Sequence, residues 1–428
     1  MNKTATAAYS RQAWTSLIAV SLFFCYEFMQ LSIFNAIGDE IMHAFHLNAK
    51  QLGNLSAYYF YANALLLIPA GIMLDKFSTK SLVLLNTLLC SIATLVFACT
   101  TNYWIAATTR FLVGCGAAFC FISCIRIASR WFPPQKMAIA TGVISMVGML
   151  GGMLTQMPCV ALNNILGWRY TILGDAALGV VIMLAIWRYV EDYPPQHQHQ
   201  PPCKLAIWST VTTALTNHHN LIAGLYASLL NFAVVLLGAL WGIQYLATNH
   251  FLSPIKASYA TMMYFAGMII GGIMYGYISD RYACRKIPMI IGPLVSLCIV
   301  LYLMLSAPLS LLTLVLLCCS LGMSISSQLL TYPTVVELNP ATITATASSV
   351  VSLLLVSGAF IIQPLFGVLM HHHYQTHRAI MTSSYNLIQY SATDIKFAMW
   401  LLPISFVVAT VIALFIPETH SGAKDSGD

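Results

Sequence analysis

The sequence predicts an all-α polytopic membrane protein with 12 transmembrane helices, arranged as two pseudo-symmetric six-helix bundles. Hydrophobic residues make up 59% of the 428 residues and charged residues only 7%, too few charges to cover the surface of a water-soluble domain. Twelve apolar stretches are each long enough to cross a bilayer as a helix. The segment GIMLDKFSTK at Gly71–Lys80 returns as GYISDRYACRK at Gly276–Lys286, and this repeat indicates two equivalent halves.

The expected spans follow from apolar runs of about 20 residues, the length that crosses the hydrocarbon core. Helices are expected because the backbone must satisfy its own hydrogen bonds in lipid, and the alternating strands of an outer-membrane barrel are absent from the sequence. The first span is too long for a secretory signal and lacks a small-residue cleavage site, so we expect it to be retained. In order, the spans are expected at residues 14–37, 52–74, 81–100, 103–127, 138–162, 168–190, 220–247, 255–278, 287–306, 309–331, 343–370 and 396–416.

A polar, proline-rich segment separates the first six spans from the last six. Its core reads YPPQHQHQPPC, which is typical of a solvated linker. We therefore expect an N-terminal six-helix bundle at 1–190, a cytoplasmic linker at 191–219, and a C-terminal six-helix bundle with its tail at 220–428. With the N-terminus inside, twelve basic residues lie on the cytoplasmic side and five outside, which favours both termini in the cytoplasm.

Several classes of function find no support in the sequence. It has no HExxH, GxSxG or P-loop motif, so we expect neither an enzyme nor an ATP-driven pump, and no cofactor. Membrane topology accounts for the basic residues, and no nucleic-acid partner is expected. The twelve cysteines lie mostly within spans and are interpreted as small buried apolar residues. No metal site is expected at His371, His372, His373 and His377, because no carboxylate or cysteine lies beside them in the predicted outer loop at His371–Gln389.

The repeated segment resembles the signature of the major facilitator superfamily, which follows the second helix of each half and reads approximately G-x-x-x-D-[RK]-x-G-x-[RK]. Both copies depart from it at the second glycine. The first copy has Gly71, Asp75, Lys76 and Lys80 with Ser78 at that place, and the second has Gly276, Asp280, Arg281 and Arg285 with Ala283 there.

Other segments extend this resemblance over nearly the whole chain. RFLVGCG at Arg110–Gly116 is similar to the family's helix 4 motif R-x-x-x-G-x-G, and WFPPQKMAIATG at Trp131–Gly142 is similar to its loop into helix 5. Helix 5 is rich in glycine, which lets two backbones approach closely, and we expect this packing at the interface between the halves. The resemblance implies a major facilitator fold and secondary active transport by alternating access.

The resemblance also implies ion pairs that hold the cytoplasmic side shut in one conformation. Asp75 is expected to pair with Arg130, braced by Glu191 or Asp192, and Glu418 is expected to meet Arg281 or Arg285. Glu337 stands where an arginine would balance the pattern, so the second set is expected to differ from the first. The alternative is a solvated charged loop that only fixes the topology. The expected gating residues are Gly71, Asp75, Lys76, Lys80, Arg130, Glu191, Gly276, Asp280, Arg281, Arg285 and Glu418.

Two ionisable residues within spans are the expected proton-coupling groups, because a charge in mid-membrane is costly and usually faces a cavity. Glu27 lies about 20 Å along a helix from Trp14, and we expect it to load a proton outside and release it inside. Arg110 is expected to bind an anionic solute group, since a guanidinium suits a carboxylate bidentately, or to relay a proton. The alternatives are a permanent pair of Glu27 with Arg110 or Arg126, and a purely structural role for Arg110.

The expected substrate site lies near the membrane midplane between the halves, as the resemblance implies. Arg126 points about 160° away from Arg110 around their helix and is expected to snorkel at the cytoplasmic end. Any single lining residue could instead be a packing residue. The expected substrate-binding residues are Tyr26, Gln30, Arg110, Arg126, Asn231, Trp241, Gln244, Tyr245, Gln328 and Tyr332.

The sequence therefore favours a secondary active transmembrane transporter of the bacterial inner membrane. We expect it to move a small polar metabolite (an amino acid, a peptide or an organic anion) by proton-coupled symport. The expected partners are this substrate, the proton and the lipid bilayer, and the expected oligomeric state is a monomer. One alternative is proton-driven efflux of a drug or siderophore. Another is a non-transporting membrane receptor built on a transporter fold.

Overall fold

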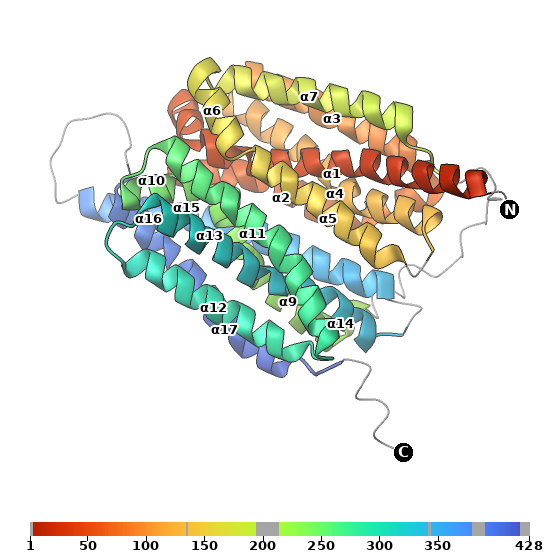
Figure 1. Ribbon diagram of the computed structural model, residues 1–428. Helices are drawn as coiled ribbons and strands as arrows, with labels where there is room; N and C mark the ends of the chain where they lie inside the picture. The colour runs from red at the N-terminus through yellow and green to blue at the C-terminus, as the bar shows by residue number, and fades with distance from the viewer. Residues whose placement is uncertain (1–2, 134–135, 194–213, 341–343, 379–389, 420–428) are drawn as a thin grey trace. The chain divides into compact units, whose positions relative to one another are not determined.

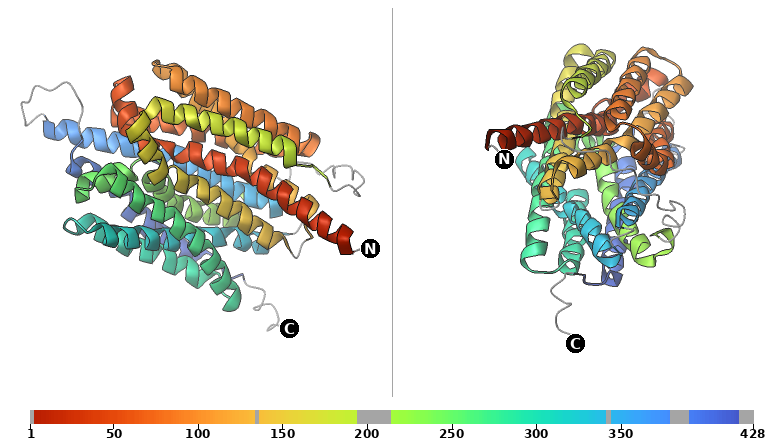
Figure 2. Two further views of the ribbon diagram at one scale, coloured as in Figure 1. Left: turned by 45° about the horizontal axis from the view of Figure 1, so that its top comes forward. Right: turned by 90° about the vertical axis from the view of Figure 1, so that its right-hand side faces the viewer.

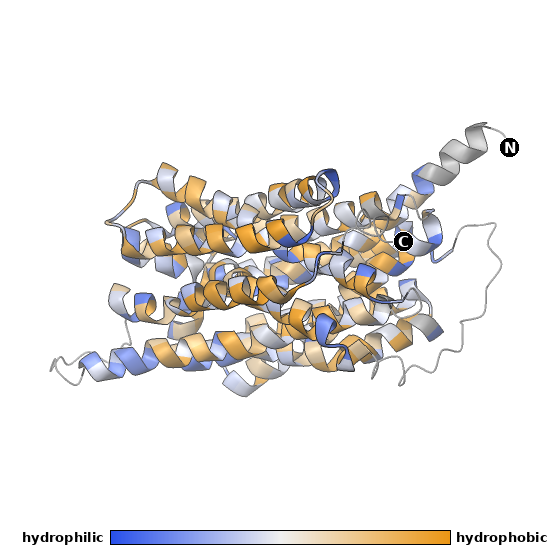
Figure 3. Cartoon of the chain, turned by 90° about the horizontal axis from the view of Figure 1, so that it is seen from below, coloured by the Kyte–Doolittle hydropathy of each residue, from blue (hydrophilic) through white to orange (hydrophobic). Residues whose placement is uncertain are grey.

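The computed structural model describes residues 3–133, 136–193, 214–340, 344–378 and 390–419. The described residues are helical nearly throughout and form no strand. Twelve helical stretches among them are long and apolar enough to cross a membrane. Hydrophobic residues run along the length of these helices, and hydrophilic residues gather near many of their ends (Figure 3). The predicted all-α fold with twelve spans is confirmed.

The chain divides into two compact units. One comprises residues 1–33 and 58–204, and the other comprises residues 34–57 and 205–428. The helices α1 (Lys3–Phe45) and α2 (Ala49–Lys76) therefore each contribute to both units. The predicted limits of the two bundles and of the linker stay predictions.

The first unit is built mainly from seven helices (Figure 1). Helix α3 packs side by side with both α4 and α7. The predicted fifth span consists of two helices, because the chain breaks at Thr155 and Gln156 and restarts with Pro158 in the first turn of α6, where a proline costs no hydrogen bond. After α1 and α2, the helices of this unit are α3 (Thr79–Cys99), α4 (Tyr103–Trp131), α5 (Met137–Leu154), α6 (Met157–Leu166) and α7 (Trp168–Tyr189).

Glycines bring helices of the first unit into backbone contact. A Cβ atom on Gly151 of α5 would overlap the carbonyl group of Cys25 on α1. A Cβ on Gly148 of α5 would overlap the ring of Phe24, which also lies on α1. The close packing expected of helix 5 is therefore present. Its described partner is α1 within the same unit, and the predicted location between the halves stays a prediction.

The second unit contains the remaining helices, several of which are interrupted. Helices α11 and α13 pack together, as do α12 and α17 (Figures 1 and 2). A 3₁₀ segment at Ser326–Leu330 joins α13 to α14 within one span. The helices are α9 (His218–Ala233), α10 (Gly242–His250), α11 (Pro254–Arg281), α12 (Lys286–Leu305), α13 (Leu311–Ile325), α14 (Thr331–Leu338), α15 (Thr344–Arg378), α16 (Ala392–Met399) and α17 (Leu401–Phe415).

The seventh span breaks between α9 and α10, where a π-helical turn covers Val234–Gly238. A break inside a span exposes backbone groups that lipid cannot satisfy. Asn35 of α1 meets three of them. Its amide nitrogen donates to the carbonyl oxygens of Leu237 and Gly238 at 3.0 and 3.1 Å, and its amide oxygen accepts from the backbone N–H of Ile243 at 3.0 Å. Asn35 thus replaces the hydrogen bonds that this break removes.

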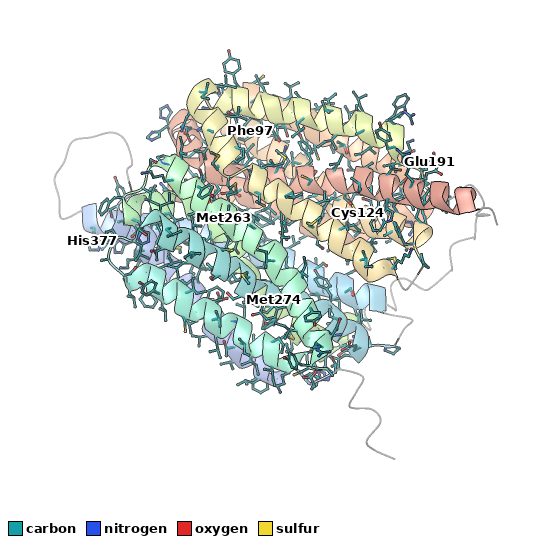
Figure 4. All side chains as sticks on the ribbon, viewed as in Figure 1. Phe97, Cys124, Glu191, Met263, Met274 and His377 are labelled. Atoms are coloured by element: carbon teal, nitrogen blue, oxygen red, sulfur yellow. The ribbon has the colours of Figure 1, made fainter. Side chains whose placement is uncertain are left out.

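The histidine-rich stretch is helical, so the prediction of an outer loop beginning at His371 is wrong. Helix α15 continues to Arg378, and Figure 4 labels His377 near this end. No proline or glycine follows Gly367 within the helix, so nothing in the sequence stops it there. The rest of the predicted loop, residues 379–389, lies outside the described residues.

Candidate functional site

Four polar side chains lie buried together in the first unit. Glu27 and Gln30 lie one turn apart on α1, and Arg110 and Asp175 come from α4 and α7. The exposed fractions of Glu27, Arg110 and Asp175 are 1%, 3% and 6%. We call these four residues the buried cluster. Burying charged groups is costly unless they compensate one another. The buried cluster is therefore the candidate functional site of this unit.

The two carboxylates of the buried cluster have matching surroundings. The amide of Gln30 donates to Asp175 Oδ2 at 2.5 Å, and the thiol of Cys90 on α3 donates to Glu27 Oε1 at 3.0 Å. The other oxygen of each, Glu27 Oε2 and Asp175 Oδ1, is buried and accepts no hydrogen bond from the described residues. Each carboxylate therefore has one oxygen held by a neutral donor and one oxygen that a proton can occupy.

Arg110 supplies the positive charge of the buried cluster. Its guanidinium interacts electrostatically with both Glu27 and Asp175. The guanidinium carbon also lies 5.3 Å from the centre of the Tyr59 ring on α2, within the range of a cation–π contact. The hydroxyl of Tyr59 donates to the backbone carbonyl of Glu27 at 3.5 Å. Side chains from α1, α2 and α7 thus surround the guanidinium that α4 provides.

The helix 4 motif explains how this convergence arises. A Cβ on Gly114 would overlap the backbone of Tyr59, so this glycine lets α2 lie directly on α4. A Cβ on Gly116 would overlap the sulfur of Cys90 and come within 3.4 Å of Glu27 Oε1. The two glycines therefore make room for the aromatic ring, the thiol and the carboxylate that surround Arg110.

Glu27 and Arg110, the two predicted proton-coupling residues, both belong to the buried cluster, and their roles stay predictions. Gln30, predicted to line the site, bonds to Asp175 instead of standing alone. Tyr26 is fully buried, and a Cβ on Gly179 of α7 would overlap its hydroxyl. Arg126 is half-buried and lies about 24 Å farther along α4 than Arg110, so the buried cluster does not include it.

Asp175 is the residue that sequence reasoning missed. It lies seven residues into the predicted sixth span, and an acid inside an apolar span is the same signal that singled out Glu27. Both Arg110 and Asp175 lie about 10 Å from the N-terminal ends of their helices. The signal was therefore present, and only the contact with Gln30 required the structure.

Two of the predicted gating residues of the first unit, Arg130 and Glu191, have polar partners near the segment that follows α7. Arg130 Nη1 donates to Thr79 Oγ1 at 3.1 Å and lies 3.9 Å from Asp192 Oδ1. Asp192 is therefore an acid beside this arginine, and the predicted pair of Arg130 with Asp75 stays a prediction. Glu191, labelled in Figure 4, accepts from the Gln12 amide at 2.7 Å. Lys76 is exposed and Gly71 has open space around it, while the side chain of Asp75 lies outside the described part of the structure.

The second unit arranges its copy of the signature around Arg285. Its guanidinium bonds to Asp280 at 2.6 Å and to Glu337 at 3.0 Å. Burial disfavours the charged guanidinium, but the hydrogen bonds to Glu337 and Asp280 outweigh this effect and raise the pKa of Arg285 above its ordinary value. Glu418 Oε1 accepts a hydrogen bond of 2.8 Å from the backbone N–H of Arg285. Arg281 is exposed, and open space surrounds Gly276.

The predicted substrate-binding residues of the second unit have mixed surroundings. The Trp241 ring is buried and stacks on Phe366 with centroids 5.5 Å apart. The hydroxyl of Tyr245 donates to the carbonyl of Leu303 at 3.1 Å, and the hydroxyl of Tyr332 lies 3.1 Å from Ser352 Oγ. The hydroxyl groups of these two tyrosines therefore have hydrogen-bond partners within the protein. Three further predicted residues, Asn231, Gln244 and Gln328, are buried or half-buried, and their role stays a prediction.

The histidines at the end of α15 contact neighbours that the sequence did not place there. His373 Nδ1 lies 2.6 Å from Asp394 Oδ1 on α16, and His371 Nδ1 lies 3.0 Å from the Tyr390 hydroxyl. A carboxylate thus does lie beside this stretch, contrary to the prediction. In the part of the chain that the structure describes, no three His, Cys, Asp or Glu side chains converge as a metal site would require.

Comparisons with known proteins point in one direction. The family model described as Major Facilitator Superfamily matches residues 19–364. The probable sulfoacetate transporter SauU of Cupriavidus necator is 28% identical over 153 residues, which are 35% of this chain and 35% of that relative, so the chain spans about a third of its length. The D-galactonate transporter of Escherichia coli O6:H1 is 21% identical over 319 residues, covering 66% of this chain and 72% of the relative. The crystal structure of the nucleoside transporter NupG has a TM-score of 0.73 at 13% identity over 95% of this chain and 99% of that one, which indicates a common fold alone.

Proposed function

The chain belongs to the Major Facilitator Superfamily, and we propose that it carries a small organic anion together with protons by alternating access. The observation that supports this proposal is a buried guanidinium, Arg110, flanked by the two carboxylates of Glu27 and Asp175. A buried guanidinium is a strong and specific partner for the carboxylate or sulfonate group of a solute. The names of two distant relatives, a sulfoacetate and a D-galactonate transporter, agree with this class of substrate.

Proton coupling follows from competition for Arg110. While Glu27 is ionised, it attracts the same guanidinium that the solute anion requires. Protonation of Glu27 removes this competitor, so the proton and the anion bind together and leave together. Coupled binding of this kind produces symport when the carrier reorients only in the loaded and empty states. Arg110 is thus the proposed anion-binding residue and Glu27 the proposed proton acceptor.

The test is uptake and counterflow in proteoliposomes with D-galactonate, sulfoacetate, alanine, a dipeptide and D-galactose. D-galactose is the control for D-galactonate, because it lacks the carboxylate. We expect an inward proton gradient to drive accumulation of one of the two organic anions but not of D-galactose. An inward proton gradient that drives the anion out of preloaded vesicles would instead assign the protein to proton-driven efflux. Uptake confined to neutral solutes would refute the proposal.

Variants connect the transport to the site. Arg110→Gln should reduce anion transport by more than about tenfold, since one charge-assisted contact is lost. Glu27→Gln should lower accumulation by about tenfold for each unit of the imposed pH gradient, while counterflow, which needs no net proton movement, continues. Arg188→Gln is the matched control, because Arg188 is exposed on α7. Full proton-driven accumulation by Glu27→Gln would refute the role of Glu27.

A further inference from the structure

We infer that Asp175 is a second proton-binding residue and that it interacts, as Glu27 does, with the guanidinium of Arg110. A solute anion then binds Arg110 without a competing carboxylate only when both acids hold a proton. This inference rests on the proposed function for its link to transport, but the presence of a second titrating acid can be tested without any solute. Nothing in the sequence motifs points to Asp175. The contacts of the buried cluster do.

The first argument is the equivalence of the two acids. Each has one oxygen bound by a neutral donor, Gln30 for Asp175 and Cys90 for Glu27. Each has a second buried oxygen that accepts no hydrogen bond from the described residues. Gln30 and Glu27 lie three residues apart on α1, hence on one face of that helix. Helix α1 therefore contributes one acid directly and holds the other acid through an amide.

The second argument is the balance of charge. Two carboxylates and one guanidinium, all buried, leave one negative charge without a compensating positive charge if both acids are ionised. A net charge buried in a membrane protein is costly, so the empty buried cluster favours at least one bound proton. When a monovalent anion binds Arg110, a second proton restores neutrality. Neither acid alone can supply both protons.

The third argument is that no other described group near Asp175 can take its place. The titratable and charged groups around it are Tyr26 and Glu27 on α1 and Arg110 on α4. On α3, Cys90 bonds to Glu27, and the charged residue of that helix, Lys80, lies in its first turn. Helix α6, which also packs on α7, has no charged residue in its sequence. Arg110 is therefore the cation that both acids share.

Infrared difference spectroscopy of the purified protein tests the inference without a solute. A protonated buried carboxyl group gives a C=O stretching band that disappears on ionisation. We expect two such bands, one absent in Asp175→Asn and the other absent in Glu27→Gln. Because the acids interact, removing either one should also move the pH midpoint of the band that remains. Glu40→Gln, an acid outside the cluster on α1, should leave both bands and both midpoints unchanged.

The pH dependence of D-galactonate binding supplies the second test. Above the pH at which the empty cluster has lost both protons, the apparent Kd of the wild type should rise about hundredfold per pH unit. For Asp175→Asn or Glu27→Gln it should rise about tenfold, and for the double variant it should not change. Asp175→Glu, which keeps the acid, should restore the steeper dependence and so separates proton binding from a structural role.

The outcomes distinguish this inference from the proposed function. Absence of an infrared band that depends on Asp175 would refute the inference, even if proton-driven anion transport is observed. The inference would also fail if Asp175→Asn kept the hundredfold dependence. Conversely, two coupled bands in a protein that binds no anion would support a paired proton site and refute the proposed function. If Asp175→Asn does not fold, the wild-type dependence of Kd on pH and the Glu27→Gln spectrum still decide the question.

Discussion

The carboxylate of Asp192 accepts a hydrogen bond of 2.8 Å from the backbone N–H of Lys80, which joins the segment after α7 to the first turn of α3. The second unit repeats this relation. Glu418, three residues beyond the end of α17, accepts from the backbone N–H groups of Arg285 and Lys286 at 2.8 and 3.0 Å, at the beginning of α12. The repeat in the sequence therefore corresponds to a repeated structural device, in which an acid just after α7 caps the start of α3 and an acid just after α17 caps the start of α12.

Removing either cap should destabilise its unit. A carboxylate at a helix N-terminus satisfies free N–H groups and interacts favourably with the helix dipole. We expect Asp192→Ala and Glu418→Ala each to cost about 1 kcal/mol, measured as a lower midpoint of thermal unfolding in detergent. Asp192→Asn and Glu418→Gln keep an acceptor oxygen and should cost less. Lys256→Ala, at an exposed position, is the control, and equal midpoints for all five proteins would contradict the capping role.

Ser78 and Ala283 replace the second glycine of the signature, and restoring glycine at these two positions should change the stability of the protein in opposite directions. Ala283 has a φ of 50°, a left-handed conformation that is costly for residues with a Cβ, so Ala283→Gly should stabilise the protein by about 1 kcal/mol. Ser78 has a φ of −59°, and its side chain accepts from the backbone N–H of Ser81 at the start of α3. Ser78→Gly should therefore destabilise by a few tenths to about 1 kcal/mol. Thermal unfolding of the two variants checks both signs, and a shift in the same direction would refute this account.

Glycines that look alike in the motifs should differ sharply in their tolerance of alanine. A Cβ on Gly114 would overlap the backbone of Tyr59, whereas open space surrounds Gly71 and Gly276. Gly114→Ala must push α2 away from α4, at a cost of about 1–3 kcal/mol, and should displace Tyr59 from Arg110. Gly71→Ala and Gly276→Ala should unfold at the wild-type temperature. Unfolding midpoints and the yield of monodisperse protein provide the measurement, and a stable Gly114→Ala variant would show that the helices can separate freely.

Much of the fold could be predicted from the sequence because each determinant is local. A run of about 20 apolar residues specifies a span wherever it occurs, and the two signature copies mark the end of the second helix in each half. Helix interruptions were harder to predict. The break after Gly238 depends on Asn35, about 200 residues earlier, which supplies the hydrogen bonds that make it tolerable. A pattern within a window of the sequence carries no information about such a partner.

The site could be predicted only where a residue is unusual in its own span. Glu27 and Arg110 are conspicuous as charges among apolar residues, and Asp175 carries the same signal. Gln30 is different, because a buried glutamine can bond to many partners and only the fold brings it 2.5 Å from Asp175. The pairing of Glu337 with Arg285 likewise depends on which helix ends meet. Spacing along the chain identifies the charged residues, but three-dimensional packing selects their partners.

Asn35 should be among the least replaceable uncharged residues of the chain. Its amide satisfies two carbonyl oxygens and one N–H group at the interruption of the seventh span. Asn35→Ala leaves these buried groups without partners and should cost about 2 kcal/mol or more, with faster hydrogen–deuterium exchange at residues 234–243. Asn35→Asp should be worse at neutral pH, because an ionised carboxylate cannot donate to Leu237 and Gly238, and it should partly recover in acid as the protonated form regains a donor. Asn249→Ala, which removes a bond within one turn of α10, is the matched control; if it cost as much as Asn35→Ala, the bridging of the break would not explain the loss.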